Sequence, residues 1–268
     1  MEFKDQLGNT VSLKGSPQRI ISLVPSQTEL LYDLGLSEEV IGITKFCIHP
    51  SEWYKTKTKV GGTKKLNLDL IRELQPDLII GNKEENTQSD IETLQKEFPV
   101  WMSDIYTIKD AIATIGMIGE MVNRKPEGDY LQHLVTTGFN DLKILSSQSH
   151  LYGKSVLYLI WRNPFMAAGK HTFIDDVLQY NGFTNAVEEK RYPELNMEQI
   201  SEINPELVFL SSEPYPFSEK HIAELSEILP NATIDLVDGE MFSWYGSRLV
   251  KAVQYFFELH SESKKDQI

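Results

Sequence analysis

Apolar residues recur along the chain either at helical intervals or in short continuous runs. One combination, a helical stretch followed by a short apolar run, occurs twice. Residues 67–80 place apolar side chains at helical intervals, followed by a proline and a short apolar run. Residues 196–209 repeat this order 129 positions later, with five of 14 positions identical. Proline blocks continuation of the helix, and an unbroken apolar run is typical of a strand buried on both faces. The pattern therefore predicts the same helix and strand in each of two similar lobes.

The remaining pattern predicts an α/β fold of two Rossmann-like lobes joined by one long helix. Alternation around Gly8-Asn9 predicts a β-hairpin, and apolar runs at 19–24 and 154–161 predict a first core strand for each lobe. Ser26 and Glu29 have the spacing of a capping box. Helical spacing over about 127–145 predicts the connecting helix. We expect residues 1–124 to form the N-terminal lobe, 125–149 the linker helix and 150–268 the C-terminal lobe.

Composition narrows the class of protein. The 268 residues carry a net charge of −13 with a pI near 5.0, which argues against nucleic-acid binding. Cys47 is the single cysteine, so no internal disulfide can form. No run approaches the ~18–20 apolar residues of a membrane span. The first residues, starting at Met1, lack the apolar region of a signal peptide. If Met1 is the true start of the chain, we expect a cytoplasmic protein. If a leader was removed, a periplasmic or cell-surface location stays open.

Several motifs in order along the chain resemble one family. They are Asp5-x-Leu7-Gly8-x-Thr10-Val11, Pro17-x-Arg19-Ile20, Pro25-Ser26-x-Thr28-Glu29, Leu74-x-Pro76-Asp77-Leu78, Ala168-Gly169-Lys170 and Asn204-Pro205-Glu206-Leu207-Val208. Together they resemble the substrate-binding proteins of cobalamin and iron-siderophore ABC importers, which are helical-backbone (class III) periplasmic binding proteins. The resemblance covers nearly the whole chain.

The resemblance implies a function and a set of partners. It implies a monomeric protein, not an enzyme, that captures a metal chelate (cobalamin, haem or a ferric siderophore) in a cleft between the lobes. No tightly bound cofactor is required. In the family, one acid on each lobe meets arginines of the membrane permease, and these acids correspond to Asp69 and Glu198. Ligands of the family lie in loops at the carboxyl ends of the strands.

Those loops supply the candidate ligand-contacting residues. Aligned onto this sequence they are Pro25, Ser26, Phe46, Cys47, His49, Thr63, Asn82, Glu84, Glu85, Trp161, Arg162, Tyr192, Trp244, Tyr245 and Arg248. Where cobalamin binders carry tryptophan, this chain has Thr63 and Asn82, a departure that leaves the identity of the ligand open.

The residue types in these loops leave several chemistries open. Cys47 and His49, with Glu84 and Glu85, could hold a metal ion directly. Lys83, Arg162 and Arg248 could instead bind carboxylates of the chelate. Trp161, Trp244 and Tyr245 could stack on a flat ligand or pack beneath the loops. Two rival functions also stay open: a cytoplasmic chelate receptor or carrier on the same fold, and a metal-dependent enzyme that uses Cys47, His49 and Glu85.

Overall fold

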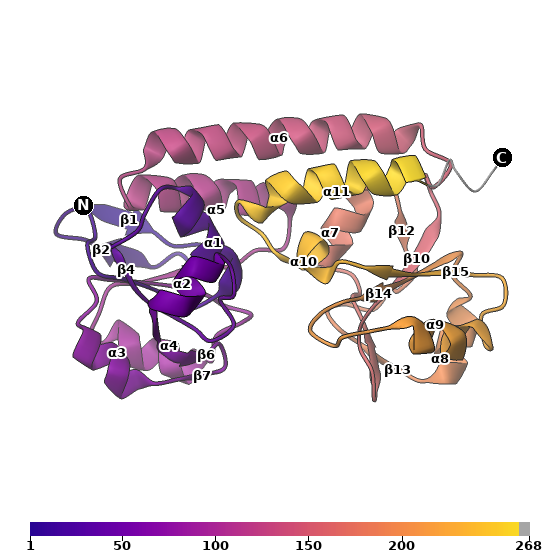
Figure 1. Ribbon diagram of the computed structural model, residues 1–268, viewed down its shortest axis with the longest axis horizontal. Coiled ribbons are helices and arrows are strands. Elements are labelled where there is room, and N and C mark those ends of the chain that lie inside the picture. Colours follow the sequence, from indigo (N-terminus) through magenta and orange to yellow (C-terminus); the bar gives the residue numbers. More distant parts are fainter. Residues whose placement is uncertain (263–268) are drawn as a thin grey trace. The chain divides into compact units, whose positions relative to one another are not determined.

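The computed structural model describes residues 1–262, and their contacts form two compact units (Figure 1). Unit 1 comprises Met1–Ile105, Lys109–Val135 and Tyr245–Arg248. Unit 2 comprises Tyr106–Ile108, Thr136–Trp244 and the described residues from Leu249 on. These units group residues by contact, and the division into domains at 124/125 and 149/150 stays a prediction.

Unit 1 is built on a five-stranded sheet in which every pair is parallel. Its strands, in spatial order, are β5 (Thr58–Lys59), β4 (Val40–Ile43), β3 (Ile20–Ser22), β8 (Leu78–Asn82) and β9 (Val100–Ser103). Two short hairpins accompany the sheet: β1 (Glu2–Lys4) with β2 (Thr10–Ser12), and β6 (Gly61–Gly62) with β7 (Lys65–Leu66). The helices are α1 (Pro25–Asp33), α2 (Ser51–Thr56), α3 (Leu68–Leu74), α4 (Gln88–Gln95) and α5 (Ile108–Met121). The β1–β2 pairing confirms the predicted hairpin.

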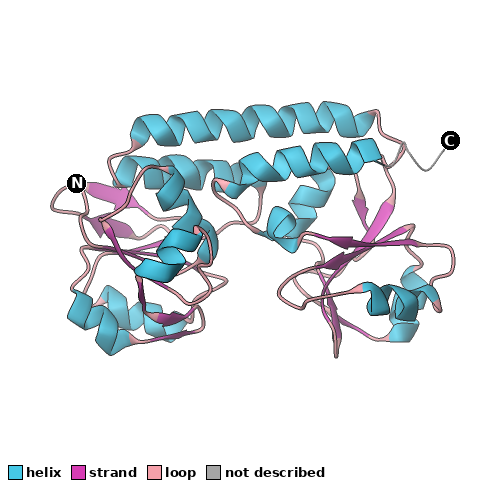
Figure 2. Ribbon diagram, viewed as in Figure 1, coloured by secondary structure: helices cyan, strands magenta, loops and turns pink. Residues whose placement is uncertain are grey.

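Unit 2 is built on a mixed sheet. Its spatial order is β13 (Glu194–Leu195), β11 (Phe165–Ala167), β10 (Ser155–Trp161), β14 (Leu207–Ser211) and β15 (Thr233–Val237), and β12 (Thr184–Asn185) also pairs with β10. Strands β12, β14 and β15 join through parallel pairs, whereas β11 and β13 join through antiparallel ones. The helices are α7 (Phe173–Tyr180), α8 (Met197–Ile203), α9 (Glu219–Ser226), α10 (Gly239–Ser243) and α11 (Arg248–Glu262). Helices and parallel strands alternate along both units, as an α/β fold requires (Figure 2).

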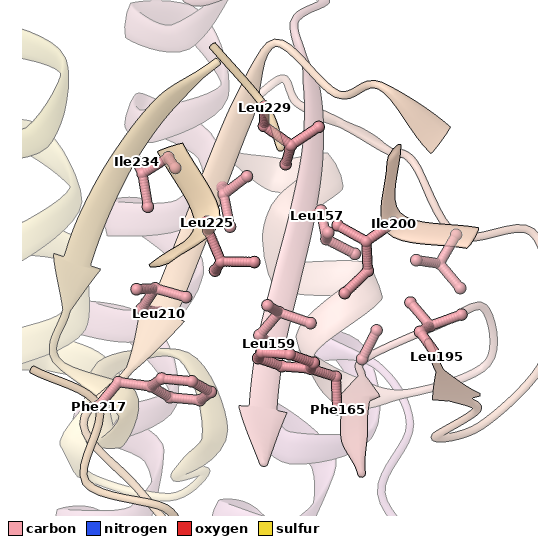
Figure 3. Packing of buried hydrophobic residues seen from close by; sticks show 13 residues of the cluster. Leu157, Leu159, Phe165, Leu195, Ile200, Leu210, Phe217, Leu225, Leu229 and Ile234 are labelled. Atoms are coloured by element: carbon pink, nitrogen blue, oxygen red, sulfur yellow. The ribbon is translucent and has the colours of Figure 1, made fainter. Parts of the chain in front are cut away.

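Buried aliphatic side chains from strands and helices form the core of each unit. In unit 2, Leu157 and Leu210 from the sheet pack with Ile200 of α8 and Leu225 of α9 (Figure 3). Unit 1 has a corresponding cluster of sheet and helix residues that includes Ile21, Ile79, Ile71 and Leu94. Because the central strands are covered on both faces, they read as continuous apolar runs.

The repeated stretch folds in the same way in both units. Asn67 and Asn196 cap α3 and α8, each accepting a hydrogen bond from the backbone N–H three residues on (3.1 and 2.9 Å). Each helix ends on a left-handed residue just before the proline: Gln75 (φ 45°, ψ 62°) and Asn204 (φ 43°, ψ 58°). The prediction of a duplicated helix–proline–strand element is confirmed, and even the φ and ψ angles of the residue before the proline agree between the two copies.

The acid after each proline then fastens the new strand to its neighbour. Asp77 accepts hydrogen bonds from the backbone N–H groups of Gln18 and Arg19 (2.8 Å each), directly before β3. Glu206 accepts one from the N–H of Ser155 (3.0 Å) at the start of β10. Because β8 pairs with β3 and β14 with β10, both carboxylates set the register of a central parallel pair.

Helix α6 (Lys125–Ser147) confirms the predicted long helix, with its residues up to Val135 in unit 1 and the rest in unit 2. Gly138 lies inside it, where a Cβ atom would come within 2.9 Å of the Val253 side chain of α11. The glycine therefore allows α11 to pack closely against α6 in unit 2. Within residues 1–262, no helix combines the length and apolar character that crossing a membrane would need.

The predicted capping box at Ser26 is wrong. Helix α1 begins two residues earlier than a Ser26 cap would place it, at Pro25, with Val24 at the cap position and no side-chain cap. Proline suits the first helical position because its missing N–H would have no partner there. The Glu29 carboxylate bonds to Arg248, far along the chain, rather than to the start of its own helix.

Candidate ligand-binding site

A buried polar network lies at the carboxyl ends of β8 and β9 in unit 1. Ser103 Oγ accepts hydrogen bonds from Asn82 Nδ2 (3.0 Å) and Gln27 Nε2 (2.7 Å). Asn82 Oδ1 accepts from the backbone N–H groups of Glu84 (2.8 Å) and Glu85 (3.1 Å). These bonds hold the loop after β8 against the sheet at the end where open α/β sheets bind ligands.

The segment 245–248, distant in sequence, packs on the same end of unit 1. The Tyr245 hydroxyl donates to Glu85 Oε1 (2.9 Å), and burial, reinforced by the Glu85 charge, raises the pKa of Tyr245. Arg248 Nε donates to Glu29 Oε2 (2.7 Å), with both side chains only 5% exposed. Sequence reasoning missed Gln27, Ser103 and the Glu29–Arg248 pair, since nothing in the local pattern connects positions so far apart.

Cys47 is buried between the side chains of two threonine residues. Its side chain is fully buried, and its Sγ accepts a hydrogen bond from Thr28 Oγ1 (3.0 Å) and lies 3.2 Å from Thr44 Oγ1. Burial raises the pKa of the Cys47 thiol, which keeps it protonated and weakens it as a metal ligand. Across residues 1–262, no group of three or more His, Cys, Asp or Glu side chains could hold a metal ion. Metal ligation by Cys47 and the half-buried His49 stays a prediction that lacks a third ligand in this part of the chain.

All three cations that were candidates for binding carboxylates of the ligand are already paired within the chain. Lys83 Nζ lies 2.7 Å from Asp104 Oδ2, and Arg248 is paired with Glu29 as described above. Arg162 donates bidentate hydrogen bonds to the Glu224 carboxylate, through Nε (3.0 Å) and Nη2 (2.8 Å). Binding of a ligand carboxylate by any of these residues would have to compete with that partner.

The candidate aromatic residues divide into an exposed and a buried group. Phe46 is 50% exposed and Trp161, at the end of β10, is 39% exposed, whereas Trp244 and Tyr245 are only 6% exposed. Tyr192, just before β13, is half-buried. Trp244 and Tyr245 therefore pack beneath the loops, while Phe46 and Trp161 stay exposed. Lys45 Nζ lies over the Phe46 ring (5.0 Å to the centroid), and the Arg191 guanidinium lies over the Tyr192 ring (5.5 Å).

Trp161 is held in place by its neighbours in unit 2. Its ring meets Tyr215 edge-on at a centroid distance of 5.7 Å. The Tyr215 hydroxyl lies 3.3 Å from His221 Nε2, and His221 Nδ1 in turn accepts a hydrogen bond from the Ser218 N–H (2.9 Å). A tryptophan supported in this way presents a rigid apolar surface.

An open pocket of about 570 Å³ lies at the carboxyl ends of β14 and β15, lined by Ser212, Glu213, Phe217, Leu236, Val237, Asp238 and Glu240. Glu213 Oε1 accepts hydrogen bonds from Ser243 Oγ (2.8 Å) and Trp244 Nε1 (2.7 Å). Burial raises the pKa of the Glu213 carboxyl. Sequence reasoning did not select Glu213, although it follows the second copy of the repeat at the same 129-residue offset as Glu84 follows the first.

The remaining candidates lie in helices and loops of both units, and their roles stay predictions. Pro25 and Ser26 are buried in the first turn of α1, and the Thr63 carbonyl accepts a hydrogen bond from Asn86 Nδ2 (3.1 Å). Asp69 in α3 and Glu198 in α8 both lie in the first turn of their helix and are exposed. The Asp69 carboxylate is bonded to Arg72 Nη1 at 2.9 Å. At the position equivalent to Arg72, unit 2 has Ser201.

Comparison with known proteins identifies the family. The model of the family described as "Periplasmic binding protein" matches residues 20–232, which include both copies of the repeat. The chain belongs to this family. The match confirms the resemblance seen in the sequence.

Individual relatives agree with this assignment. The uncharacterised ABC transporter substrate-binding lipoprotein YvrC of Bacillus subtilis is 27% identical over 267 residues, covering 95% of this chain and 83% of that protein. A vitamin B12-binding protein of Pectobacterium atrosepticum is 26% identical over 259 residues, covering 92% and 90%. The apo structure of the periplasmic haem-binding protein RhuT from Roseiflexus sp. RS-1 matches with a TM-score of 0.80 at 19% identity, covering 92% of this chain and 99% of that one. These structural and sequence matches confirm the predicted α/β fold class.

Proposed function

We propose that this protein binds a metal chelate (a corrinoid, haem or a ferric siderophore) and delivers it to an ABC-type importer. The observation that carries the proposal is the family match, which extends over both units. Relatives that the chain resembles bind vitamin B12 or haem according to their names, and one is a lipoprotein of an ABC transporter. These relatives favour a location outside the cytoplasmic membrane over the cytoplasmic carrier, and transport over catalysis.

Phe46, Trp161 and Tyr192 are the proposed main contacts of the ligand. Phe46 and Trp161 are exposed and Tyr192 is half-buried, whereas the candidate cations are paired with carboxylates of the chain. Large aromatic rings bind flat apolar faces well, because they bury area at little cost in conformational entropy. The loop at 82–86 and Glu213 would supply hydrogen bonds at the polar edge of the chelate. This distribution favours a macrocycle with an apolar face over a ligand bound chiefly through its carboxylates.

Direct titration tests the proposal. The purified protein would be titrated with cyanocobalamin, hemin and a ferric siderophore, with tryptophan fluorescence and absorption as readouts. We expect one of the three to bind with Kd of about 1 μM or tighter. Trp161→Ala should weaken that binding about tenfold, because it removes the stacking surface. Tyr130→Ala is the matched control, since Tyr130 is an exposed aromatic on α6. Failure of all three chelates to bind, or equal losses in both variants, would contradict the proposal.

Delivery to the permease depends, in this proposal, on Asp69 and Glu198. Reversing the charge in Glu198→Lys should reduce chelate uptake through the cognate permease about tenfold, while the affinity for the chelate stays unchanged. Asp69→Lys should have a smaller effect, because Arg72 already neutralises part of the Asp69 charge. Glu202→Lys, one turn along α8, is the control. Loss of chelate affinity in Glu198→Lys, or uptake as low in Glu202→Lys, would argue against docking through Glu198.

A further inference from the structure

One segment of unit 1 has a charge opposite to that of the rest of the chain. Residues 45–65 contain six of the 26 lysine and arginine residues and only one of the 39 acids. The segment therefore carries a net charge of +5, while the remainder carries −18. In a protein this acidic, such a concentration of lysine produces a positive patch on an otherwise negative surface.

No lysine of this segment is neutralised by an ion pair in the described part of the chain. Lys55 and Lys65 are exposed, and within residues 1–262 their side chains form no hydrogen bond, ion pair or ring contact. Lys57 and Lys59 lie over the rings of Trp53 (5.5 Å) and Tyr54 (5.1 Å), and their Nζ atoms donate to the backbone carbonyls of Ser37 (2.8 Å) and Lys57 (2.7 Å). These bonds to neutral carbonyls leave the positive charges in place, although desolvation lowers the pKa of Lys59.

These lysines follow one edge of the sheet. Lys55 and Lys57 end α2, Lys59 lies on β5 at the edge of the sheet, and Lys65 lies on β7 of the hairpin that follows. We call these four residues the basic edge. Lysine on an edge strand also prevents pairing with another sheet. That role does not account for Lys55, which lies in α2.

Exposed apolar side chains accompany the basic edge. Ile48 and Tyr54 are each 43% exposed, and Tyr32, which meets Trp53 edge-on at 5.4 Å, is 40% exposed. Lysine together with exposed aromatic and aliphatic side chains is the combination that binds the surface of an anionic bilayer. The lysines are attracted to the headgroups, and the apolar side chains enter the interface.

We propose that the basic edge binds the surface of a membrane rich in anionic phospholipid. The charge of the patch is complementary to that surface, and the remainder of the molecule, at −18, is repelled by it. Binding would therefore orient the protein with the edge strand β5 toward the bilayer. An orientation of this kind would suit a protein that serves a membrane importer, but it does not depend on which chelate the protein binds.

Vesicle sedimentation with the full chain tests the proposal. We expect the protein to sediment with phosphatidylcholine vesicles that contain about one-third phosphatidylglycerol, and to stay in solution with phosphatidylcholine alone. Raising the salt from about 0.05 M to about 0.5 M should release it, because the headgroup attraction is screened. No binding to the anionic vesicles at low salt would overturn the proposal, and so would retention on heparin or RNA without vesicle binding.

A matched pair of variants locates the surface. Lys55→Gln with Lys65→Gln removes two charges of the basic edge at exposed positions whose side chains form no hydrogen bond, ion pair or ring contact within residues 1–262. It should weaken vesicle binding about 30-fold, given about 1 kcal/mol for each lysine near the surface. Lys14→Gln with Lys96→Gln changes the net charge by the same amount at exposed positions elsewhere in unit 1, and should keep binding within about twofold of the original.

Comparison of the two double variants and a substitution of an apolar residue complete the test. Equal weakening in both double variants would overturn the proposal, because overall net charge and not the basic edge would then govern binding. Ile48→Ser should reduce vesicle binding to a smaller extent and leave its salt dependence unchanged, since it removes apolar contact only. Chelate affinity, measured on the same samples, should be unaffected by Lys55→Gln with Lys65→Gln. Vesicle and chelate binding thus succeed or fail independently.

Discussion

Unit 1 and unit 2 place the same helix–proline–strand element in two different sheets. In unit 1 the strand β8 lies in an all-parallel sheet, whereas in unit 2 the equivalent β14 belongs to a sheet extended by the antiparallel strands β11 and β13. The caps, the left-handed residue and the acid after the proline are shared. The repeat therefore specifies its local conformation and its central pairing, while the outer strands depend on the rest of each half.

The two units also differ in how they treat charge. Unit 1 buries an ion pair, Glu29–Arg248, with both side chains 5% exposed. In unit 2, the side chains of the bidentate ion pair Arg162–Glu224 are 26% and 29% exposed. Unit 2 instead buries two histidines, His221 and His260, at 2% and 3% exposure. The variants below test these contrasts, beginning with the largest expected effect.

Glu29→Ala should lower the free energy of unfolding of unit 1 by about 3–5 kcal/mol, because it leaves the Arg248 charge buried without this partner. Glu224→Ala in unit 2 should cost about 1 kcal/mol, since water can solvate Arg162. Urea unfolding combined with hydrogen exchange of the strand amides measures both. Replacing the pair together, Glu29→Leu with Arg248→Met, should recover most of the loss. Similar costs for Glu29→Ala and Glu224→Ala would show that the contrast in burial has no energetic consequence.

Acidification should weaken unit 2 before unit 1. Burial lowers the pKa of His260 from 6.5 to about 4, so the folded state holds the ring neutral. The associated stability is fully present above pH 6.5 and is lost as pH falls toward 4, by about 2 kcal/mol. Burial lowers the pKa of His221 as well, with the same sign. Hydrogen exchange at pH 6.5 and pH 5 should show faster opening in unit 2 only.

His260→Phe provides the check on this assignment. Its ring can keep the stacking on Phe183, which in the original protein has a centroid distance of 5.7 Å and an interplanar angle of 17°. The pH dependence of unit 2 should be reduced but not abolished, because His221 remains. An unchanged pH dependence would exclude His260 as its source.

The caps of the two copies should differ in strength. Asn196→Ala and Asn67→Ala should each cost about 1 kcal/mol, because each removes the acceptor for the backbone N–H three residues on. The α8 cap has a second bond, donated by the Asn196 N–H to Gln199 Oε1 (2.9 Å), whereas Leu70 at the equivalent position of α3 cannot accept one. Gln199→Ala should therefore cost about 0.5 kcal/mol in addition. Thermal unfolding measures each variant, and Asn196→Ser is the control that keeps an acceptor at the cap. No loss of stability in Gln199→Ala would contradict the role of the reciprocal bond.

The smallest effect is expected at the left-handed turns. Gln75→Gly should stabilise unit 1 by about 0.5 kcal/mol, because a side chain at φ 45° is strained and glycine is not. Asn204→Gly should change the stability of unit 2 less, since asparagine adopts this conformation more readily than glutamine. Urea unfolding of the two variants measures the difference. Destabilisation by Gln75→Gly would indicate that its side-chain bond to the Arg72 carbonyl (2.7 Å) outweighs the strain.

The fold could be predicted further than the site. Proline, asparagine caps and apolar spacing act over a few residues, so the elements around 67–80 and 196–209 could be placed from local chemistry alone. The capping box at Ser26 was wrong because the partner of Glu29 is Arg248, more than 200 residues away. The sequence indicated Asn82 and Glu85 as candidate site residues, but it did not indicate Gln27 and Ser103, which belong to the same buried network and come from other elements.

Residue types and their short-range spacing were enough to predict the α/β class, the duplicated element, the long helix and the family, and they also contain the charge reversal in residues 45–65. The folded chain was needed to learn which aromatic residues stay exposed, that the cations Lys83, Arg162 and Arg248 are already paired, and that Cys47 is enclosed. Exposure and pairing depend on which distant segments meet, and the spacing of residues along the chain does not encode those contacts.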